Sequence, residues 1–458
     1  MRTEYDMVII GGGMAGLNAA QRAVDAGLQV AVIERDRPGG TCPIRGCIPT
    51  KALVRSAEVV HEIRRAAEFG IRVGDVEVDF AAVMDRVRGI IDRGATATKQ
   101  WIVDLEGADL IEGEGSFAGP NAVRVNGHVL TAPRIVVSTG AVPGVPPIPG
   151  LDETPFMTSD DVLQLSVLPR RLLVIGAGPI ALELGQALGR LGATVTMVEV
   201  APRLLGNDEP EFADALIARL RGEGIEILPG AVIDRVMPDD GGGVRMAVTH
   251  DGAQRTLEGD ALLVAAGRAP AVAELNLEAA GLPESRRGIP VDDHLRAGEG
   301  IWAAGDVLGA PWGAFTHVAR RLGNEVVDRA TGADDSPVDP DVGPRAIFTD
   351  PELVSIGLTE ARAREAGFEV TAATRPFQGG KARAWGEEHG MAKVVCETGT
   401  GRILGASILG YHAADLIHPV AVAMQAGPDA VSLIQRTMHV HPTLGEVVKF
   451  AVHAAGGV

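Results

Sequence analysis

The chain has 458 residues and a net charge of −18, because 60 acidic residues outnumber 42 basic ones. This charge repels phosphate backbones, and an aromatic content of 3% is too low for stacking on bases, so both features argue against nucleic-acid binding. At about 150 residues per domain, the length predicts about three domains.

The sequence contains only three cysteines, too few for an extracellular disulfide framework, which predicts a reducing, cytoplasmic location. We do not expect residues 1–20 to act as a signal peptide, because Glu4 and Asp6 stand where a basic segment is needed. No apolar run approaches the roughly 18 residues of a membrane span, so we expect no membrane association.

A nucleotide-binding signature lies near the N-terminus. The β-branched run 5–10 predicts a buried parallel strand, and residues 17–26 and 28–33 predict a helix and a second strand. Between the first strand and the helix lies the glycine-rich segment 11–16, and the second strand ends at Glu34. Strand, G-x-G-x-x-G, helix, strand and acidic residue together form the dinucleotide fingerprint.

The glycines and the glutamate of this fingerprint each meet a physical requirement of dinucleotide binding. Gly11 permits the tight turn, Gly13 lets the backbone approach a pyrophosphate, and Gly16 allows the helix to pack closely on the strand. Glu34 would accept hydrogen bonds from a ribose diol.

Two of the three cysteines, Cys42 and Cys47, lie in the stretch 39–51 directly after this signature. The spacing suits a redox pair or half of a zinc site. Zinc would require two further ligands, and only His61 is near, so we predict no metal. At the start of a helix, both thiolates would be stabilised by the helix dipole and by Lys51.

The rest of the first half predicts helices over 51–69 and 80–105, a hairpin around Asn126-Gly127 and a strand over 135–140. The proline-rich segment 141–150 then predicts a crossing between domains.

A second fingerprint follows from residue 171. A strand over 172–175 leads into the turn 176–181, with Gly176 and Gly178 in the first two small positions, and then a helix over 181–191. The next strand ends at Glu199, whose carboxylate accepts from a ribose 2′-hydroxyl and repels a 2′-phosphate. This favours NAD(H) over NADP(H).

Strands over 260–268 and 300–306 close the nucleotide-binding part, and the second of them ends in Gly305-Asp306, where a carboxylate can meet a ligand. From residue 343 the composition changes. We predict an antiparallel sheet and two helices there, over 346–348, 391–396, 402–409, 413–426 and 428–437.

The order of motifs resembles the class I pyridine nucleotide–disulfide oxidoreductases, flavoproteins that include dihydrolipoyl dehydrogenase, glutathione reductase and mercuric reductase. The segments that carry the resemblance are 11–16, 39–51, 138–140, 176–183, 305–306 and 438–446. It implies an α/β fold with two Rossmann-like, doubly wound nucleotide-binding domains and a C-terminal α+β dimerisation domain. The implied division is an FAD-binding domain over 1–150 and 271–342, an NAD-binding domain over 151–270 and a dimerisation domain over 343–458.

The resemblance also implies FAD on the first fingerprint and NAD(H) on the second, with Lys51 near the flavin and Glu183 as its ion-pair partner. The implied cofactor-contacting residues are Gly11, Gly13, Gly16, Glu34, Lys51, Gly115, Thr139, Gly140, Gly176, Gly178, Glu183, Glu199, Gly267, Asp306 and Ala314.

By the same pattern, Cys47 is the thiol that faces the flavin and Cys42 the thiol that exchanges with substrate. Exchange needs a base, and His441, oriented by Glu446, fits this role. The family pattern places His441 in the site of the other subunit of a homodimer. Without the resemblance, His441-Pro442 would be interpreted as an ordinary loop.

Dihydrolipoyl dehydrogenase is the most similar family member by motif. Mercuric reductases end in a vicinal cysteine pair and carry tyrosine where His441 stands, and Glu199 argues against the NADP(H) site of glutathione reductases. One departure is Ile44, where an asparagine is usual. The leading substrate is dihydrolipoamide, such as the lipoyl group of a carrier protein. The alternatives are an NADH-dependent reductase of another small disulfide and a flavin- and NAD-binding regulatory protein with an idle dithiol.

Overall fold

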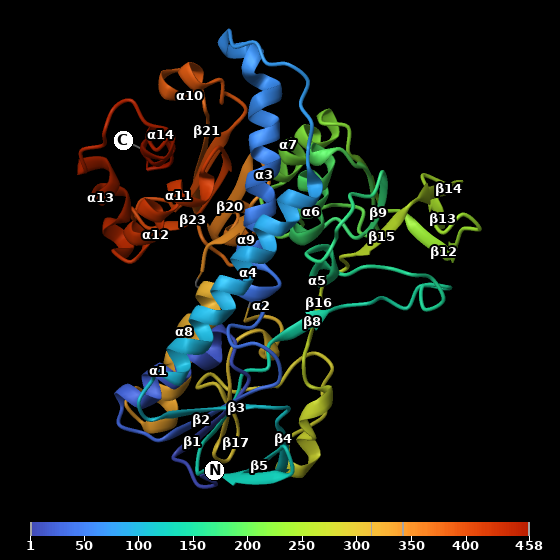
Figure 1. Ribbon diagram of the computed structural model, residues 1–458. Coiled ribbons are helices and arrows are strands. Elements are labelled where there is room, and N and C mark those ends of the chain that lie inside the picture. The colour runs from blue at the N-terminus through green and yellow to red at the C-terminus, as the bar shows by residue number, and fades with distance from the viewer. Residues whose placement is uncertain (1, 313, 341–342, 457–458) are drawn as a thin grey trace.

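The computed structural model describes residues 2–312, 314–340 and 343–456. Three units are visible, each built on one main β-sheet and its helices (Figure 1). We call them the first unit (a six-stranded sheet), the second unit (a four-stranded sheet) and the C-terminal domain (a five-stranded sheet). The predicted α/β architecture is confirmed.

The sheet of the first unit has the order β17-β18-β7-β1-β2-β3 and is parallel except for β17. Its strands are β1 (Met7–Ile10), β2 (Val30–Glu34), β3 (Ala108–Glu112), β7 (Ile135–Val137), β17 (Arg296–Gly298) and β18 (Ile301–Ala303). Strands β1, β2, β7 and β18 are buried on both faces and apolar except for Glu34 at the end of β2, because helices and loops cover the sheet. Strand β18 pairs with β7, so the second unit is inserted between two neighbouring strands of one sheet.

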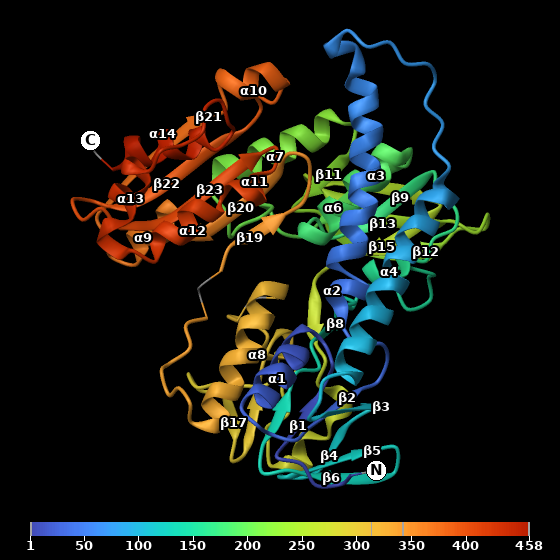
Figure 2. The ribbon, with the colours of Figure 1, turned by 60° about the vertical axis from the view of Figure 1, so that its left-hand side comes forward.

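The helices of the first unit carry Cys42, Cys47 and Lys51. They are α1 (Met14–Asp25), α2 (Thr41–Ile44), α3 (Cys47–Arg65), α4 (Phe80–Val103) and α8 (Thr316–Thr331). Figure 2 shows α1 beside α8 on the sheet, with α3 and α4 rising from it toward the second unit. The predicted hairpin at Asn126-Gly127 is present in the small sheet of β4 (Ser116–Gly119), β5 (Ala122–Val125) and β6 (His128–Thr131).

The second unit repeats the design of the first. Its parallel sheet has the order β11-β10-β9-β15, and its elements are α5 (Ser159–Val162), β9 (Arg171–Ile175), α6 (Pro179–Leu191), β10 (Thr194–Glu199), α7 (Pro210–Gly222), β11 (Glu226–Pro229) and β15 (Ala261–Val264). An antiparallel meander that the sequence analysis did not identify precedes β15: β12 (Val232–Pro238), β13 (Val244–His250) and β14 (Ala253–Gly259).

The chain crosses between the first and second units twice, and the two crossings pair with each other. Strand β8 (Ala141–Pro143) leaves the first unit, and β16 (Arg268–Pro270) returns to it in antiparallel register. We call this two-stranded pair the joint. The proline-rich segment predicted as a crossing begins there.

The C-terminal domain has an antiparallel sheet of order β19-β20-β23-β22-β21. Its elements are β19 (Arg345–Ile347), β20 (Glu352–Gly357), α9 (Glu360–Glu365), β21 (Val370–Pro376), α10 (Gly380–Trp385), β22 (Met391–Glu397), β23 (Ile403–Gly410), α11 (Ala413–Leu416), α12 (His418–Met424), α13 (Ala430–Arg436) and α14 (Glu446–Ala455). The helix predicted over 413–426 is wrong as one element, because Pro419 lacks an N–H and stands in the first turn of a new helix, α12. Helix α14 was not predicted.

None of the helices within the described ranges is long and apolar enough to cross a membrane.

Gly16, in the first turn of α1, packs against the residues that directly follow β1 and β7. A β-carbon at this position would lie 1.9 Å from the Gly11 carbonyl oxygen and 2.7 Å from the Ser138 hydroxyl. Only glycine allows α1 to start this close to β1 and β7, as the fingerprint predicts.

We therefore expect Gly16→Ala to lower the free energy of unfolding by about 3 kcal/mol, because α1 must move away from the glycine-rich loop. Urea denaturation followed by circular dichroism measures this. Gly222→Ala is the matched control in another helix. A β-carbon there meets no atom within 4 Å, so the control should be neutral or slightly stabilising. Equal effects of the two substitutions would contradict the packing argument.

Candidate active site

The two cysteines lie on two consecutive helices of the first unit, a single turn and a long helix. Cys42 belongs to α2, Cys47 is the first residue of α3, and both are free, half-buried thiols. The Cys47 sulfur lies 3.2 Å from the Thr316 hydroxyl, at the N-terminus of α8. The expectation that both cysteines start one helix is wrong for Cys42, because the chain turns at Gly46 between α2 and α3.

The two thiols differ in acidity. The pKa of Cys47 is lowered to about 6 by a hydrogen bond from the Cys42 thiol, and further by the Thr316 hydroxyl and the charge of Lys51. The same hydrogen bond, together with burial, raises the pKa of Cys42. At neutral pH, Cys47 is therefore a thiolate and Cys42 a protonated thiol.

Lys51 is held by both of the other units. Its ammonium lies 2.7 Å from Oε2 of Glu183, a buried residue of α6, so the predicted ion pair is present. The other Glu183 oxygen accepts the backbone N–H of Phe348 at 2.9 Å. The Lys51 ammonium also lies 4.3 Å from the centre of the Phe348 ring. The three units therefore meet at Lys51, one helical turn after Cys47.

The two glycine-rich loops have the same hydrogen bonds. Glu34 accepts the N–H groups of Gly12 and Asp36 at 2.8 and 2.9 Å. Glu199 accepts those of Ala177 and Ala201 at the same distances. Each carboxylate thus fixes its own loop, a role the sequence analysis did not predict. Each retains lone pairs with which it can accept a ribose hydroxyl.

The loops fit a dinucleotide. Gly11 and Gly176 have positive φ values of 105° and 100°. A β-carbon at Gly178 would meet no atom within 4 Å, and one at Gly13 would meet only the Gly40 Cα, at 4.0 Å. This space adjoins the N-termini of α6 and α1, whose first turns carry no acidic side chain. Backbone N–H groups at such termini suit a pyrophosphate.

The remaining predicted cofactor residues lie at the ends of the sheets. The Thr139 hydroxyl donates to the Ala271 carbonyl at 2.7 Å, and Asp306 follows β18, where burial raises the pKa of its carboxyl. A β-carbon at Gly115 would lie 3.1 Å from the side chains of Ile10 and Ile33, and Ala314 is exposed before α8. Gly140 and Gly267 have positive φ and open space around them.

His441 and Glu446 form the predicted pair. The His441 Nδ1 lies 3.0 Å from both carboxylate oxygens of Glu446, the first residue of α14, and this hydrogen bond lowers the pKa of Glu446. The His441 side chain is 74% exposed. Helices α13 and α14, which flank it, lie on the outer side of the C-terminal domain, away from α2 (Figure 2). The described chain therefore does not bring His441 to its own cysteines.

Of the unusual residues between the cysteines, only Ile44 is buried. Ile44 is buried in the core beneath α3, and a β-carbon at Gly39 would lie 2.6 Å from the Pro43 ring. Arg45 forms an ion pair with Asp36. The departure at Ile44 is therefore a packing difference, and Arg45 already has a carboxylate partner.

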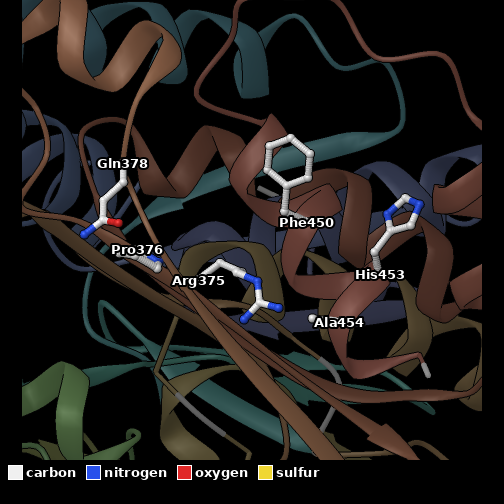
Figure 3. Close-up of a pocket in the computed structure, with 6 residues that line it drawn as sticks. All are labelled: Arg375, Pro376, Gln378, Phe450, His453 and Ala454. Carbon is white, nitrogen blue, oxygen red and sulfur yellow. The ribbon is translucent and has the colours of Figure 1, made fainter. Parts of the chain in front are cut away.

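The described residues contain no group of three or more histidine, cysteine, aspartate or glutamate side chains arranged to hold a metal ion. A surface groove of about 500 Å³ lies on the C-terminal domain between β21 and α14 (Figure 3). None of the predicted site residues is among those that line it, which are Arg375, Pro376, Gln378, Phe450, His453 and Ala454.

Comparison with known proteins identifies the family. The profile of the pyridine nucleotide-disulphide oxidoreductases matches residues 5–324, and the profile of their dimerisation domain matches residues 343–452. The chain belongs to this family. The oxidoreductase is therefore a flavoprotein that uses FAD and NAD(H), and the cofactor prediction is confirmed.

Relatives of this oxidoreductase carry several names. Dihydrolipoyl dehydrogenase of Bacillus subtilis is 34% identical over 100% of this chain and 99% of its own length. Mercuric reductase of Bacillus cereus is 36% identical over 98% of this chain and 71% of its own. The structure of the HOCl-induced flavoprotein disulfide reductase RclA from Escherichia coli, as a Cu(II) complex, matches with a TM-score of 0.87 at 31% identity, covering 99% of both chains.

Thr316 and Phe348 are site residues that sequence reasoning missed. Phe348 lies in a segment, 348–352, that resembles dihydrolipoyl dehydrogenase, but nothing in that segment pointed to Lys51, because each of the two residues reaches the site from an element that is distant in the chain. For Thr316, the only available signal is its place at the start of a helix that follows the Gly305-Asp306 strand.

In the NADH-reduced enzyme, we expect the thiolate-to-flavin absorbance band to disappear as pH falls through about 6, because protonation of Cys47 removes the thiolate. Thr316→Val removes a hydrogen-bond donor that favours the charged form, so the midpoint should rise to about pH 7. Spectrophotometric titration measures both midpoints. Thr331→Val, at the far end of α8, is the control. A midpoint that Thr316→Val leaves unchanged would remove Thr316 from the site.

Proposed function

We propose that the enzyme is an FAD-dependent NAD(H):disulfide oxidoreductase whose Cys42–Cys47 pair passes electrons to or from a small dithiol or disulfide, with dihydrolipoamide as the leading substrate. The observation that carries this proposal is the unequal thiol pair. Cys47 is stabilised as a thiolate next to Lys51, and Cys42 keeps its proton. A cysteine pair without a catalytic role would require neither this difference in acidity between the two thiols nor the His441–Glu446 pair.

When the enzyme reduces a substrate disulfide, side chains of this protein carry out each thiol–disulfide exchange and each proton transfer. Bound FAD supplies the route by which two electrons from NADH reduce the Cys42–Cys47 disulfide. His441 takes the proton of the Cys42 thiol, and the resulting thiolate attacks one sulfur of the substrate disulfide, whose S–S bond breaks as a mixed disulfide forms. The departing sulfur takes this proton from His441. The Cys47 thiolate then attacks the Cys42 sulfur and restores the Cys42–Cys47 disulfide, and the second substrate sulfur leaves as a thiolate that takes a proton from solvent.

His441 can serve this step only from a second copy of the chain. Its ring is exposed on the C-terminal domain, on a surface that also exposes Met438 and Val440. The matched dimerisation domain supports a homodimer in which each copy lends His441 to the other's cysteines. Glu446 orients the ring through its hydrogen bond to Nδ1.

The substrate assignment has support from full-length relatives. The dihydrolipoyl dehydrogenase of Bacillus subtilis spans the whole chain, and Ile44, the departure from that pattern, is buried and away from solvent. The alternative, reduction of another small disulfide by NADH, has support from the similarity to RclA, a flavoprotein disulfide reductase. We extend the proposal to the domain division given above and to a cytoplasmic location, in keeping with the three cysteines.

The deciding experiment compares substrates with one preparation of the flavin-loaded enzyme. We expect kcat/KM for dihydrolipoamide with NAD to be at least about tenfold higher than kcat/KM for glutathione disulfide, cystine or Hg(II) with NADH. Cys42→Ser should abolish turnover. Cys47→Ser should remove the thiolate-to-flavin band. Faster reduction of another disulfide would establish the alternative. Turnover that survives Cys42→Ser would refute the dithiol mechanism.

Mixed dimers test the position of His441. His441→Ala alone should slow turnover about 100-fold, because the leaving thiolate loses its proton donor. When His441→Ala and Cys42→Ser subunits are combined, one of the two sites regains an intact cysteine pair and an intact histidine. Activity should then return to about half per dimer. Mixed dimers that stay inactive would show that the histidine does not act across the subunits.

A further inference from the structure

An exposed arginine lies on the helix face that contacts the cysteine pair. Arg320 is in α8, four residues after Thr316, whose hydroxyl is 3.2 Å from the Cys47 sulfur. Residues four apart share one face of a helix and lie about 6 Å apart along its axis, so Arg320 is the next side chain on this face. Among the described residues, its polar contact is with Met14, whose sulfur lies 3.7 Å from Nη2.

The positive charge of Arg320 acts on Cys42. The hydrogen bond with Cys47 and burial raise the pKa of Cys42, and the charge of Arg320 opposes this rise. Because the interaction between charges weakens with distance and with solvent screening, the guanidinium acts on this thiol from nearby. An anion bound to Arg320 therefore lies beside the sulfur that the proposed exchange step uses.

Neighbouring arginines on the same two helices have carboxylate partners, and Arg320 has none within the described ranges. Arg321 lies 2.8 Å from Glu325 in α8, and Arg22 of α1 lies 2.6 Å from Asp328 of α8. The first turns of α1 and α8, which flank Arg320, carry no acidic side chain. The chain contains 60 acidic residues, yet no described carboxylate neutralises the guanidinium next to the cysteines. This charge is therefore available to a ligand.

We propose that Arg320 selects substrates that carry a carboxylate near their disulfide or dithiol, by binding that carboxylate through its terminal N–H groups. The inference rests on the proposed function, because it places the substrate at Cys42, and it names the class of substrate that the site prefers. A guanidinium and a carboxylate match in geometry, since two parallel hydrogen bonds join them. The net charge of −18 repels more highly charged anions, so a single carboxylate fits best.

This role distinguishes two forms of the leading substrate. Free dihydrolipoate ends in a carboxylate, whereas dihydrolipoamide ends in a neutral amide, and the two share one dithiol and one carbon chain. We expect kcat/KM of the wild-type enzyme to be about fivefold higher for dihydrolipoate, because a charge-assisted hydrogen bond is stronger than a neutral one.

The test is the ratio of kcat/KM for dihydrolipoate to kcat/KM for dihydrolipoamide, measured with the flavin-loaded enzyme and NAD. Arg320→Gln should bring this ratio close to one, and Arg320→Glu should reverse the preference. Arg320→Lys should keep part of it, since lysine retains the charge but not the fork of donors. A general loss of activity or of folded protein cancels in the ratio. A wild-type ratio near one, or a ratio that Arg320→Gln leaves unchanged, would overturn the proposal.

Arg22→Gln is the matched control. It removes the same charge from the α1–α8 pair, but the partner of Arg22 is Asp328, about two helical turns beyond Arg320. We expect the wild-type ratio to persist in this variant. Added salt should lower the wild-type ratio by screening and should not change that of Arg320→Gln. Equal effects of the two substitutions would show that net charge, and not a contact at Arg320, sets the preference, which would overturn the proposal.

FAD retention separates a substrate role from a cofactor role. Met14 begins α1, next to the glycine-rich loop that suits a pyrophosphate, so Arg320 also lies near the FAD-binding loop. We expect wild-type and Arg320→Gln enzymes to release FAD equally on dilution, followed by flavin fluorescence. Faster release from the variant would assign the guanidinium to the cofactor and overturn the proposal.

A pair of linear disulfides keeps the test independent of the lipoyl assignment. Dithiodipropionate carries carboxylates, hydroxyethyl disulfide is neutral, and both are offered with NADH. If lipoyl compounds are not turned over, the substrate part of the proposed function fails, but a preference for dithiodipropionate that Arg320→Gln removes would still support this role of Arg320. The absence of a preference for the acid in both pairs would overturn it, whichever disulfide the enzyme turns over fastest.

Discussion

The ion pair between Lys51 and Glu183 is the interaction on which the site depends. Glu183 is buried in α6, and both of its oxygens are used, one by the Lys51 ammonium and one by the backbone N–H of Phe348. A buried carboxylate with only one of these partners would be costly. The pair therefore fixes α3, α6 and the segment before β20 with respect to one another, and through α3 it fixes Cys47.

The two cysteines near this ion pair have the same side chain but different acidities. Their neighbours lower the pKa of Cys47 and raise the pKa of Cys42. The difference arises from a shared proton: the thiol that donates stabilises the thiolate that accepts. Such coupling keeps one sulfur deprotonated and the other protonated, and the proposed exchange between the two cysteines and a substrate depends on this division.

The two nucleotide-binding units contain the same hydrogen-bonded arrangement of a glycine-rich turn and a glutamate. In both, a glutamate at the end of the second strand accepts an N–H from the glycine-rich turn and another from two residues beyond itself. The carboxylate thus shapes the loop before any ribose binds. The units differ in their connections, since the second unit is inserted between strands of the first and returns through the joint.

Local patterns in the sequence were sufficient for the strands, turns and glycines of both fingerprints, because period, turn geometry and helix-start chemistry act within a few residues. They also identified the cysteine pair, and the family pattern indicated Lys51, Glu183, His441 and Glu446. Only the tertiary structure brought Thr316 to Cys47, Phe348 to Lys51 and Arg320 to Met14, because each lies far along the chain from its partner. It also decided that Cys42 has a short helix of its own and that Ile44 is buried. Contacts of this kind depend on how the units pack, and no local pattern encodes that.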